Sequence, residues 1–227
     1  MKIKYLGHSA FLIKTDKGGA LIDPYLEFTK EYADLNNFKN DNLQAIFVTH
    51  AHSDHFGSAM EISKLTNAPI VGVFELGNYC LSKGVNAIPA ALGGEIEFSF
   101  GCATLVPAQH SSSLPNGQYM GVACGVMLNI DGVNIYHAGD TSLSSEMEML
   151  SEFYEPTVSI LPVGGHFTMG INEACYAAKI FASPITIPRH YNRFPPIKID
   201  IKEFEEKCKL ITGITPTVME PDKEIEL

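Results

Sequence analysis

The segment from Thr49 to His55, Thr-His-Ala-His-Ser-Asp-His, places four groups that can bind metal ions within six residues. In an extended loop, residues two apart point the same way, so His50 and His52 can bind one ion together. Asp54 and His55 lie where a helical pattern begins and can face a second ion. Histidine and carboxylate groups suit zinc, iron, manganese or nickel. The segment therefore indicates a transition-metal site, and the alternative is a helix-capping loop that is rich in histidine by chance.

Three more potential ligands follow predicted strands elsewhere in the chain. They are His110 after Cys102–Val106, Asp140 after Val133–Tyr136 and His190 after Ile185–Ile187. Loops at strand ends present functional groups on a rigid sheet. Because a lone histidine is more often an ordinary core or surface residue, the metal hypothesis depends on the joint placement of all these residues.

Three of the eight histidines remain outside this set, namely His8, His137 and His166. His8 follows the first predicted strand. It could line the pocket as a proton donor or substrate contact, or it could equally be a hydrogen-bonded core residue. His166 lies in a glycine-flanked loop after another predicted strand, so we expect it to face the pocket and to act in catalysis. His137 ends a strand and is expected to lie behind the ligands or in the core.

Three charged residues near these motifs could support the site. Asp23, which precedes Pro24, could accept the free ring N–H of a ligand histidine, or it could belong to an Asp-Pro turn. Arg189 and Arg193 flank His190 and could bind a phosphate or carboxylate of the substrate. The alternative for both arginines is an exposed charge or an ordinary ion pair.

The composition limits the partners that the protein can have. With 16 Lys+Arg against 26 Asp+Glu, the formal net charge of −10 disfavours nucleic acids and anionic lipids, whose binding depends largely on Lys and Arg. The five cysteines are widely spaced without a Cys-x-x-Cys pair, which argues against disulfides and a zinc ribbon. No apolar run approaches the ~18 residues of a spanning helix, and the N-terminal segment does not resemble a signal peptide. A cytoplasmic protein without membrane contact is expected.

The predicted elements form two similar halves within one domain, residues 1–227. In the first half, apolar periodicity predicts strands at Lys2–Leu6, Ala10–Thr15, Ala20–Ile22, Ala45–Val48 and Pro69–Val73, and helices at Gly57–Leu65 and Glu75–Ser82. In the second half, antiparallel strands are expected at Glu95–Ser99, Cys102–Val106, Val122–Ile130 and Val133–Tyr136, the last two joined by an Asp131-Gly132 hairpin. Strands at Val158–Leu161 and Ile185–Ile187 then alternate with helices at Ser144–Leu150, Asn172–Phe181 (capped by Asn172) and Ile199–Leu210. Two mixed sheets packed face to face, with helices outside, would satisfy this pattern.

The chain resembles the metallo-β-lactamase superfamily of hydrolases. The matching elements, in the family's order, are Thr-His-x-His-x-Asp-His at 49–55, His110, Gly139-Asp140 and His190. The opening Leu6-Gly7-His8-Ser9 and the segment from Gly164 to Met169 are similar to a small branch of metal-dependent hydrolases related to ascorbate-6-phosphate lactonases. The resemblance implies a fold of the α/β (α+β) class. It would be a four-layer αββα sandwich of two mixed β-sheets with outer helices. The resemblance also implies a dinuclear metal site at one edge of the sheets.

The resemblance further implies a role for each ligand. One ion would be held by His50, His52 and His110, the second by Asp54, His55 and His190, and Asp140 would bridge both. The cofactors would be two divalent transition-metal ions, zinc first, with manganese, nickel or iron as alternatives. Ions about 3.5–4 Å apart would share a hydroxide that attacks a carbonyl or phosphorus. Asp54 could orient that hydroxide or carry its proton.

These expectations favour a hydrolase of a small ester, lactone or phosphoester, with an anionic substrate as one option. A homo-oligomer is an open alternative to a monomer. A nuclease or phosphodiesterase of the same superfamily is the second hypothesis. It would need basic or RNA-binding modules for which this chain has no room. A non-catalytic metal sensor fits less well, because a structural site closes its coordination shell and rarely needs a bridging carboxylate. An oxygen-reducing di-iron protein would need a flavin domain, and no phosphate-binding glycine motif of that kind is visible.

Overall fold

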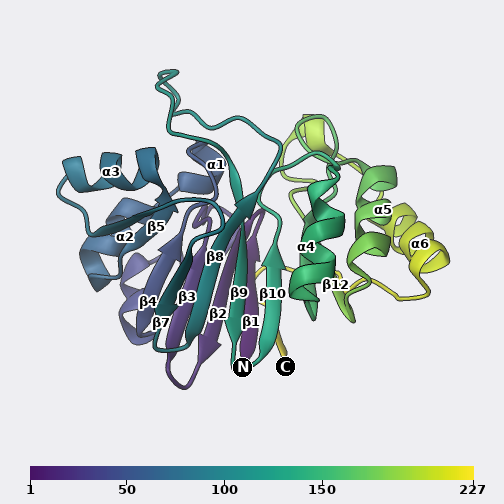
Figure 1. Cartoon of the computed structure of the whole chain (residues 1–227), viewed down its shortest axis with the longest axis horizontal. Helices are drawn as coiled ribbons and strands as arrows, with labels where there is room; N and C mark the ends of the chain where they lie inside the picture. Colours follow the sequence, from purple (N-terminus) through teal and green to yellow (C-terminus); the bar gives the residue numbers. More distant parts are fainter.

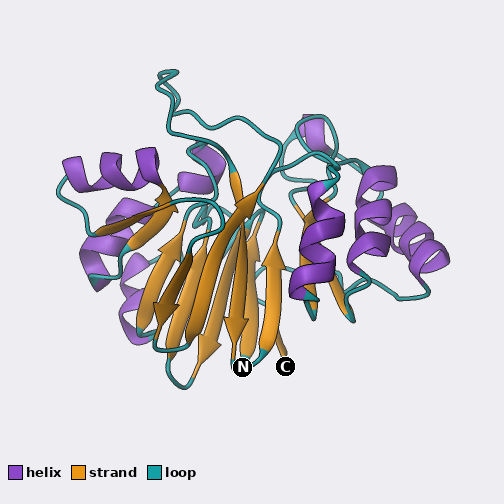
Figure 2. Cartoon of the chain, viewed as in Figure 1, coloured by secondary structure: helices purple, strands orange, loops and turns teal.

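Two mixed β-sheets pack face to face in the computed structural model, which describes residues 1–227 (Figure 1). The helices lie outside the pair of sheets, at either side of it (Figure 2). This arrangement confirms the predicted α+β fold of two mixed sheets with outer helices. None of the helices has the length and apolar character that a membrane crossing requires.

The first sheet has seven strands. In spatial order they are β13 (Glu224–Glu226), β1 (Lys2–Gly7), β2 (Ala10–Thr15), β3 (Gly18–Ile22), β4 (Leu43–Phe47), β5 (Ile70–Val73) and β6 (Ala87–Ala90). Strands β1 to β3 are antiparallel to one another, whereas β3 to β6 run parallel. The C-terminal ends of β1, β3 and β4 therefore lie at one edge of this sheet. The sequence did not predict the short edge strands β6 and β13.

The second sheet has six strands. In spatial order they are β12 (Ile185–Arg189), β11 (Val158–Pro162), β10 (Val133–His137), β9 (Cys124–Ile130), β8 (Gly101–Pro107) and β7 (Glu95–Phe98). Strands β7 to β10 are antiparallel, as predicted, and β10 to β12 are parallel. The β9–β10 hairpin turns at Asp131 and Gly132, whose φ angles of 49° and 83° are those that a tight hairpin turn requires. Strands β8, β10, β11 and β12 thus all end at the same edge.

The helices divide between the two sheets. They are α1 (Ser53–Phe56), α2 (Ala59–Thr66), α3 (Phe74–Ser82), α4 (Glu146–Tyr154), α5 (Ile171–Phe181) and α6 (Ile201–Thr212), with 3-10 turns η1 (Leu35–Asn40) and η2 (Pro195–Ile197). α2 and α3 contact strands of the first sheet, while α5 contacts β11 as well as α4 and α6. The prediction that Asn172 caps α5 was wrong: Gly170 is the N-cap, and Asn172 accepts a hydrogen bond from Lys207 of α6.

The core follows the alternation of side chains across each strand. In β9, Val126 and Leu128 belong to a cluster of 42 buried residues drawn from both sheets. Met127, between them, belongs instead to a second cluster of 16 residues that includes side chains of α4, α5 and α6. Both faces of the second sheet are therefore buried, and its strands form a rigid support for the loops at their ends.

Backbone hydrogen bonds join the two sheets at the edge where the predicted ligands lie. The N–H of Cys124 donates to the carbonyl of Thr49 over 3.0 Å, and the N–H of His190 donates to the carbonyl of His8 over 3.0 Å. The first of these contacts needs a glycine nearby. Gly139 has a φ of 61°, and a Cβ at this position would lie 2.2 Å from the carbonyl oxygen of Cys124. The Gly139-Asp140 pair is thus fixed by close packing of the two sheets.

Candidate metal centre

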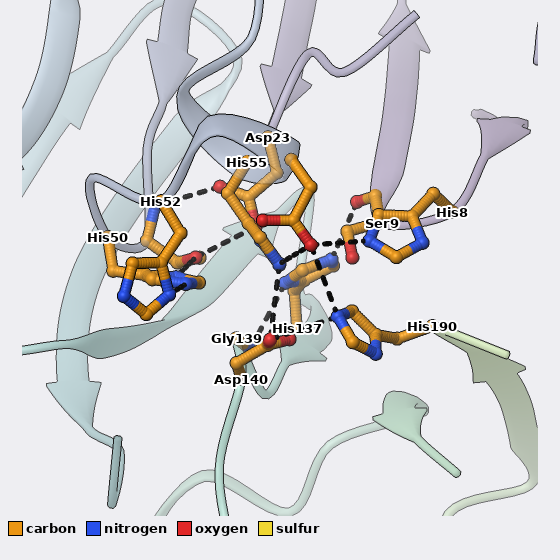
Figure 3. A network of polar contacts seen from close by, with 12 residues as sticks. His8, Ser9, Asp23, His50, His52, His55, His137, Gly139, Asp140 and His190 are labelled. Atoms are coloured by element: carbon orange, nitrogen blue, oxygen red, sulfur yellow. Dashed lines mark hydrogen bonds and ion pairs between the residues drawn. The ribbon is translucent and has the colours of Figure 1, made fainter. Parts of the chain in front are cut away.

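The seven predicted ligands meet at this shared edge, together with His8. Figure 3 shows several of them converging from loops after β1, β4, β10 and β12. The ligand atoms fall into three groups within which all lie no more than 4.8 Å apart: His50, His52 and His110; His8, Asp54, His55 and His190; and His50, His55 and Asp140. Because His50 and His55 each belong to two groups, the three groups form one continuous centre.

The first group consists of histidines alone. The Nε2 atom of His50 lies 3.0 Å from the Nδ1 atom of His52, and the ring of His110 lies 5.0 Å from that of His50. Burial lowers the pKa of His50 well below its usual value, and burial also lowers the pKa values of His52 and His110. Neutral imidazoles have a free lone pair, so this group is suited to a metal ion at neutral pH.

The second group surrounds the Asp54 carboxylate. Its Oδ2 atom lies 3.0 Å from Nε2 of His8, 3.6 Å from Nε2 of His190 and 3.9 Å from Nε2 of His55. Burial raises the pKa of Asp54, but the His190 and His8 imidazoles beside it outweigh that effect and hold it below its usual value. The side chain is 27% exposed, so Asp54 is both ionised and open to solvent.

Asp140 lies between the two groups. Its Oδ2 atom is 3.1 Å from Nε2 of His190, 3.3 Å from Nε2 of His55 and 3.8 Å from Nε2 of His110. The same oxygen thus faces one histidine of the first group and two of the second. Burial raises its pKa, but His55 and His190 together bring it well below the usual value, so the carboxylate is ionised. One carboxylate oxygen between two sets of imidazoles is the position that a bridging ligand would occupy.

The donor set fits metal ions on a further observation. Nε2 of His55 and Nε2 of His190 are buried, face Asp140 and form no hydrogen bond. Buried polar atoms are nearly always hydrogen-bonded, so unpartnered atoms that converge on one point call for a ligand. Imidazole nitrogens and carboxylate oxygens in this number suit divalent transition-metal ions.

Comparisons with known proteins identify the family. The β-lactamase superfamily domain matches residues 2–190 of the chain. The chain belongs to this superfamily. It is 46% identical over 220 residues to a UPF0173 metal-dependent hydrolase of Staphylothermus marinus, covering 95% of this chain and 92% of the relative. It is 42% identical over 237 residues to a UPF0173 metal-dependent hydrolase of Pyrococcus abyssi, covering both chains fully.

A solved structure agrees with these sequence relatives. Igni18, a metallo hydrolase from Ignicoccus hospitalis, superposes with a TM-score of 0.90 at 37% identity, over 100% of this chain and 98% of that chain. The superfamily resemblance read from the sequence is therefore confirmed. The chain is a metal-dependent hydrolase of the metallo-β-lactamase superfamily, and its candidate ligands are the histidine and aspartate groups described above.

Asp23 contacts one of the candidate ligands, His55. It is fully buried, and its Oδ2 atom accepts a 2.7 Å hydrogen bond from Nδ1 of His55. Oδ1 accepts from the backbone N–H of Thr49 and Oδ2 accepts from its hydroxyl, each over 2.8 Å. A carboxylate bound to Nδ1–H fixes the tautomer of the ring and leaves Nε2 free to bind a metal. The structure thus favours the tautomer-fixing role of Asp23 over a simple turn.

His137 lies behind the ligands, fully buried. Its Nε2 atom lies 3.1 Å from the carbonyl oxygen of Ser9, and its Nδ1 atom accepts a 3.3 Å hydrogen bond from the N–H of Gly139. Only the neutral ring with its proton on Nε2 satisfies both contacts. Burial, aided by the positive charge of Arg189, lowers the pKa of His137 to about 3.

We expect the unfolding free energy of His137→Gln to fall less at acid pH than that of the wild type. The wild-type ring has a lower pKa folded than unfolded, so its contribution is full above pH ~6.5 and is lost as the pH falls toward 3. One such group removes about 1.4 kcal/mol of unfolding free energy per pH unit in that interval. Urea unfolding of chelator-treated protein at pH 7 and pH 4.5 measures the difference, with His166→Gln as a control. Equal pH dependence in wild type and His137→Gln would contradict the assignment.

The other two unassigned histidines have opposite positions. His8 is fully buried, and its Nε2 atom is within hydrogen-bond distance of Asp54, so it belongs to the centre. His166 does not reach the centre: it is exposed, its ring packs 4.4 Å from that of Phe167, and it is absent from every group of ligands. The expectation that His166 faces the pocket is not met, because His166 is absent from the lining of the pocket beside His52 and Asp54.

Of the two arginines, only Arg189 differs from expectation. Arg189 is fully buried, and its Nη1 atom donates to Asp140 and Ser9 rather than facing solvent. A role in substrate binding therefore does not fit Arg189. Arg193 is half-buried, with its guanidinium 4.7 Å above the ring of Phe28, and it lines a pocket of about 340 Å³ with Lys198. A substrate role for Arg193 stays a prediction.

The sequence reading missed the surroundings of the centre. A pocket of about 360 Å³ has His52, Ser53 and Asp54 on one side and Ser113 and Leu114 on the other. The last two belong to the long loop 108–123 between β8 and β9, which projects beyond the sheets (Figure 1). On the opposite side, three aromatic rings pack within 6.5 Å of the His8 ring, those of Tyr25, Phe28 and Phe194. No local pattern marks these residues, which come from distant parts of the chain.

Proposed function

We propose that the chain hydrolyses a small ester, lactone or phosphoester at a centre of two divalent metal ions. The observation that carries this proposal is the position of Asp140 Oδ2, within 3.8 Å of one histidine from the first group and two from the second. A purely structural site would close around one ion and would not need a carboxylate between two sets of ligands.

Each residue of the centre has a role in this proposal. One ion would be held by His50, His52 and His110, the other by Asp54, His55 and His190, and Asp140 would bridge them. Zinc is the first candidate, and manganese, nickel and iron are alternatives, because these ligands discriminate poorly among such ions. Bound ions would lower the pKa of a shared water and polarise the carbonyl or phosphoryl oxygen of the substrate.

Asp54 would accept the proton of the attacking water, and His8 would position Asp54. Asp54 is the more exposed of the two carboxylates in the centre and lines the 360 Å³ pocket, so its carboxylate can accept a proton from the attacking water. The Nε2–H of His8 donates to Asp54 Oδ2 and would hold that carboxylate in place. Burial lowers the pKa of His8 to about 4, so the ring is neutral at pH 7 and acts as a hydrogen-bond donor.

The surroundings support a small substrate with an apolar part. The pocket of about 360 Å³ is at the lower end of the range for small-molecule sites. The net charge of −10 repels a polyanion such as RNA or DNA. The half-buried rings of Tyr25, Phe28 and Phe194 offer an apolar surface beside His8, and Arg193 behind Phe28 could bind an anionic group of the substrate.

A hydrolysis screen tests the proposal. Protein loaded separately with zinc, manganese and nickel is assayed on small esters, lactones, phosphomonoesters and phosphodiesters. We expect turnover of at least one class, and a loss of at least ~100-fold in His110→Ala, since removing a ligand should exceed the effect of removing a partner of a ligand. His166→Ala, which removes an exposed histidine outside the centre, is the matched control and should keep full activity.

Two results would count against this function. No turnover with any metal, in protein that binds two ions, would favour a metal sensor. Cleavage of RNA or DNA at low salt without turnover of small substrates would favour the nuclease alternative.

A further inference from the structure

Arg189 is the largest fully buried side chain of the protein. It ends β12, directly before the predicted ligand His190, and its Nη1 atom donates to two acceptors at once. These are Asp140 Oδ1 at 3.0 Å and Ser9 Oγ at 2.6 Å. A buried guanidinium is rare unless it is paired, and Asp140 is the only carboxylate within 4.0 Å of it.

The two oxygens of Asp140 therefore have separate partners. Oδ1 accepts from Arg189, whereas Oδ2 faces the ring nitrogens of His55 and His190 at 3.3 and 3.1 Å. A carboxylate can rotate about its last bond and can bind one ion through both oxygens. Because the guanidinium binds Oδ1, only Oδ2 is left for the centre.

We propose that Arg189 is a positioning residue that makes Asp140 a single-oxygen bridge between the two metal sites. This inference depends on the proposed dinuclear centre. The buried cation also balances the charge of Asp140 in protein from which metal has been removed. Without it, Asp140 would turn to bind one ion through both oxygens, and the second site would lose a ligand.

Cobalt-loaded protein tests this inference without any substrate. Wild type should bind two Co²⁺ ions and show the electron paramagnetic resonance signature of two coupled ions. Arg189→Met, which keeps the length but not the charge, should bind the second ion ~10- to 100-fold more weakly and lose the coupling. Arg189→Lys should restore the second ion and the coupling, because it keeps a cation that donates to Asp140.

Control variants separate positioning from general support. Ser9→Ala removes the other acceptor of Arg189 and should keep both ions and their coupling. If Arg189→Met does not fold, Arg189→Leu, which likewise has neither a donor nor a charge, should show the same loss. Two tightly bound, coupled ions in a folded, uncharged variant would overturn the inference and leave the proposed function intact. A wild type that binds fewer than two ions would instead overturn the dinuclear centre itself.

Discussion

Asp140→Asn is expected to lose at least one metal ion and to lower turnover by at least ~100-fold. The reason lies in the contacts of the two carboxylate oxygens. In the variant, the amide oxygen would turn toward Arg189, because the guanidinium can only donate. The amide NH₂ group would then face Nε2 of His55 and of His190, at the point where a bridging oxygen is needed.

Metal content and thermal unfolding measure this effect directly. Purified Asp140→Asn should hold about one ion or none by elemental analysis, and added zinc should raise its melting temperature less than that of wild type. Asp16→Asn makes the same chemical change at an exposed turn and is the control. Wild-type metal content together with wild-type turnover in Asp140→Asn would contradict the bridging role.

The meeting of the candidate ligands at one edge could be predicted from the sequence because the fold brings strand ends together. Four of them, from His50 to His55, follow a single apolar strand and need no long-range information. His110, Asp140 and His190 follow strands β8, β10 and β12, which are mutually parallel and so end at the same edge. The sequence predicted these strands but not their order in the sheet, and that order brings the candidate ligands close.

The supporting residues could not be predicted in the same way. Arg189 contacts Ser9, which lies 180 positions away in the chain. The sequence around Arg189 and His190 does not distinguish a buried arginine from an exposed one. His8 and His166 both lie in glycine-containing loops after strands, yet one is buried and the other exposed. That difference depends on how the loops pack between the sheets. Edge strand β13 was missed because three residues carry too little pattern, and its pairing with β1 spans the whole chain.

Asp23→Asn should weaken both the fold and the metal centre. The native carboxylate accepts three hydrogen bonds, from the N–H and hydroxyl of Thr49 and from Nδ1–H of His55. An asparagine has one acceptor oxygen and one donor group, so either orientation of the amide directs its NH₂ at another donor. If NH₂ faces His55, the ring must move its proton to Nε2, which then cannot bind a metal ion.

We expect this variant to lose roughly 3–5 kcal/mol of unfolding free energy and ~10- to 100-fold in metal affinity. Contacts with His55 outweigh the effect of burial and hold the pKa of Asp23 below its usual value. Its contribution to stability is therefore present at neutral pH and is lost as the pH falls below ~4. Urea unfolding across this interval and zinc titration measure both effects.

Thr49→Val is the matched variant, because it removes one donor to Asp23 but keeps the charge and the contact with His55. It should cost only about 1 kcal/mol, and because it also removes the contact of the Thr49 hydroxyl with Nδ1 of His50, it should weaken metal binding less than Asp23→Asn does. An Asp23→Asn protein no weaker than Thr49→Val in both measurements would show that Asp23 does not fix the tautomer of His55.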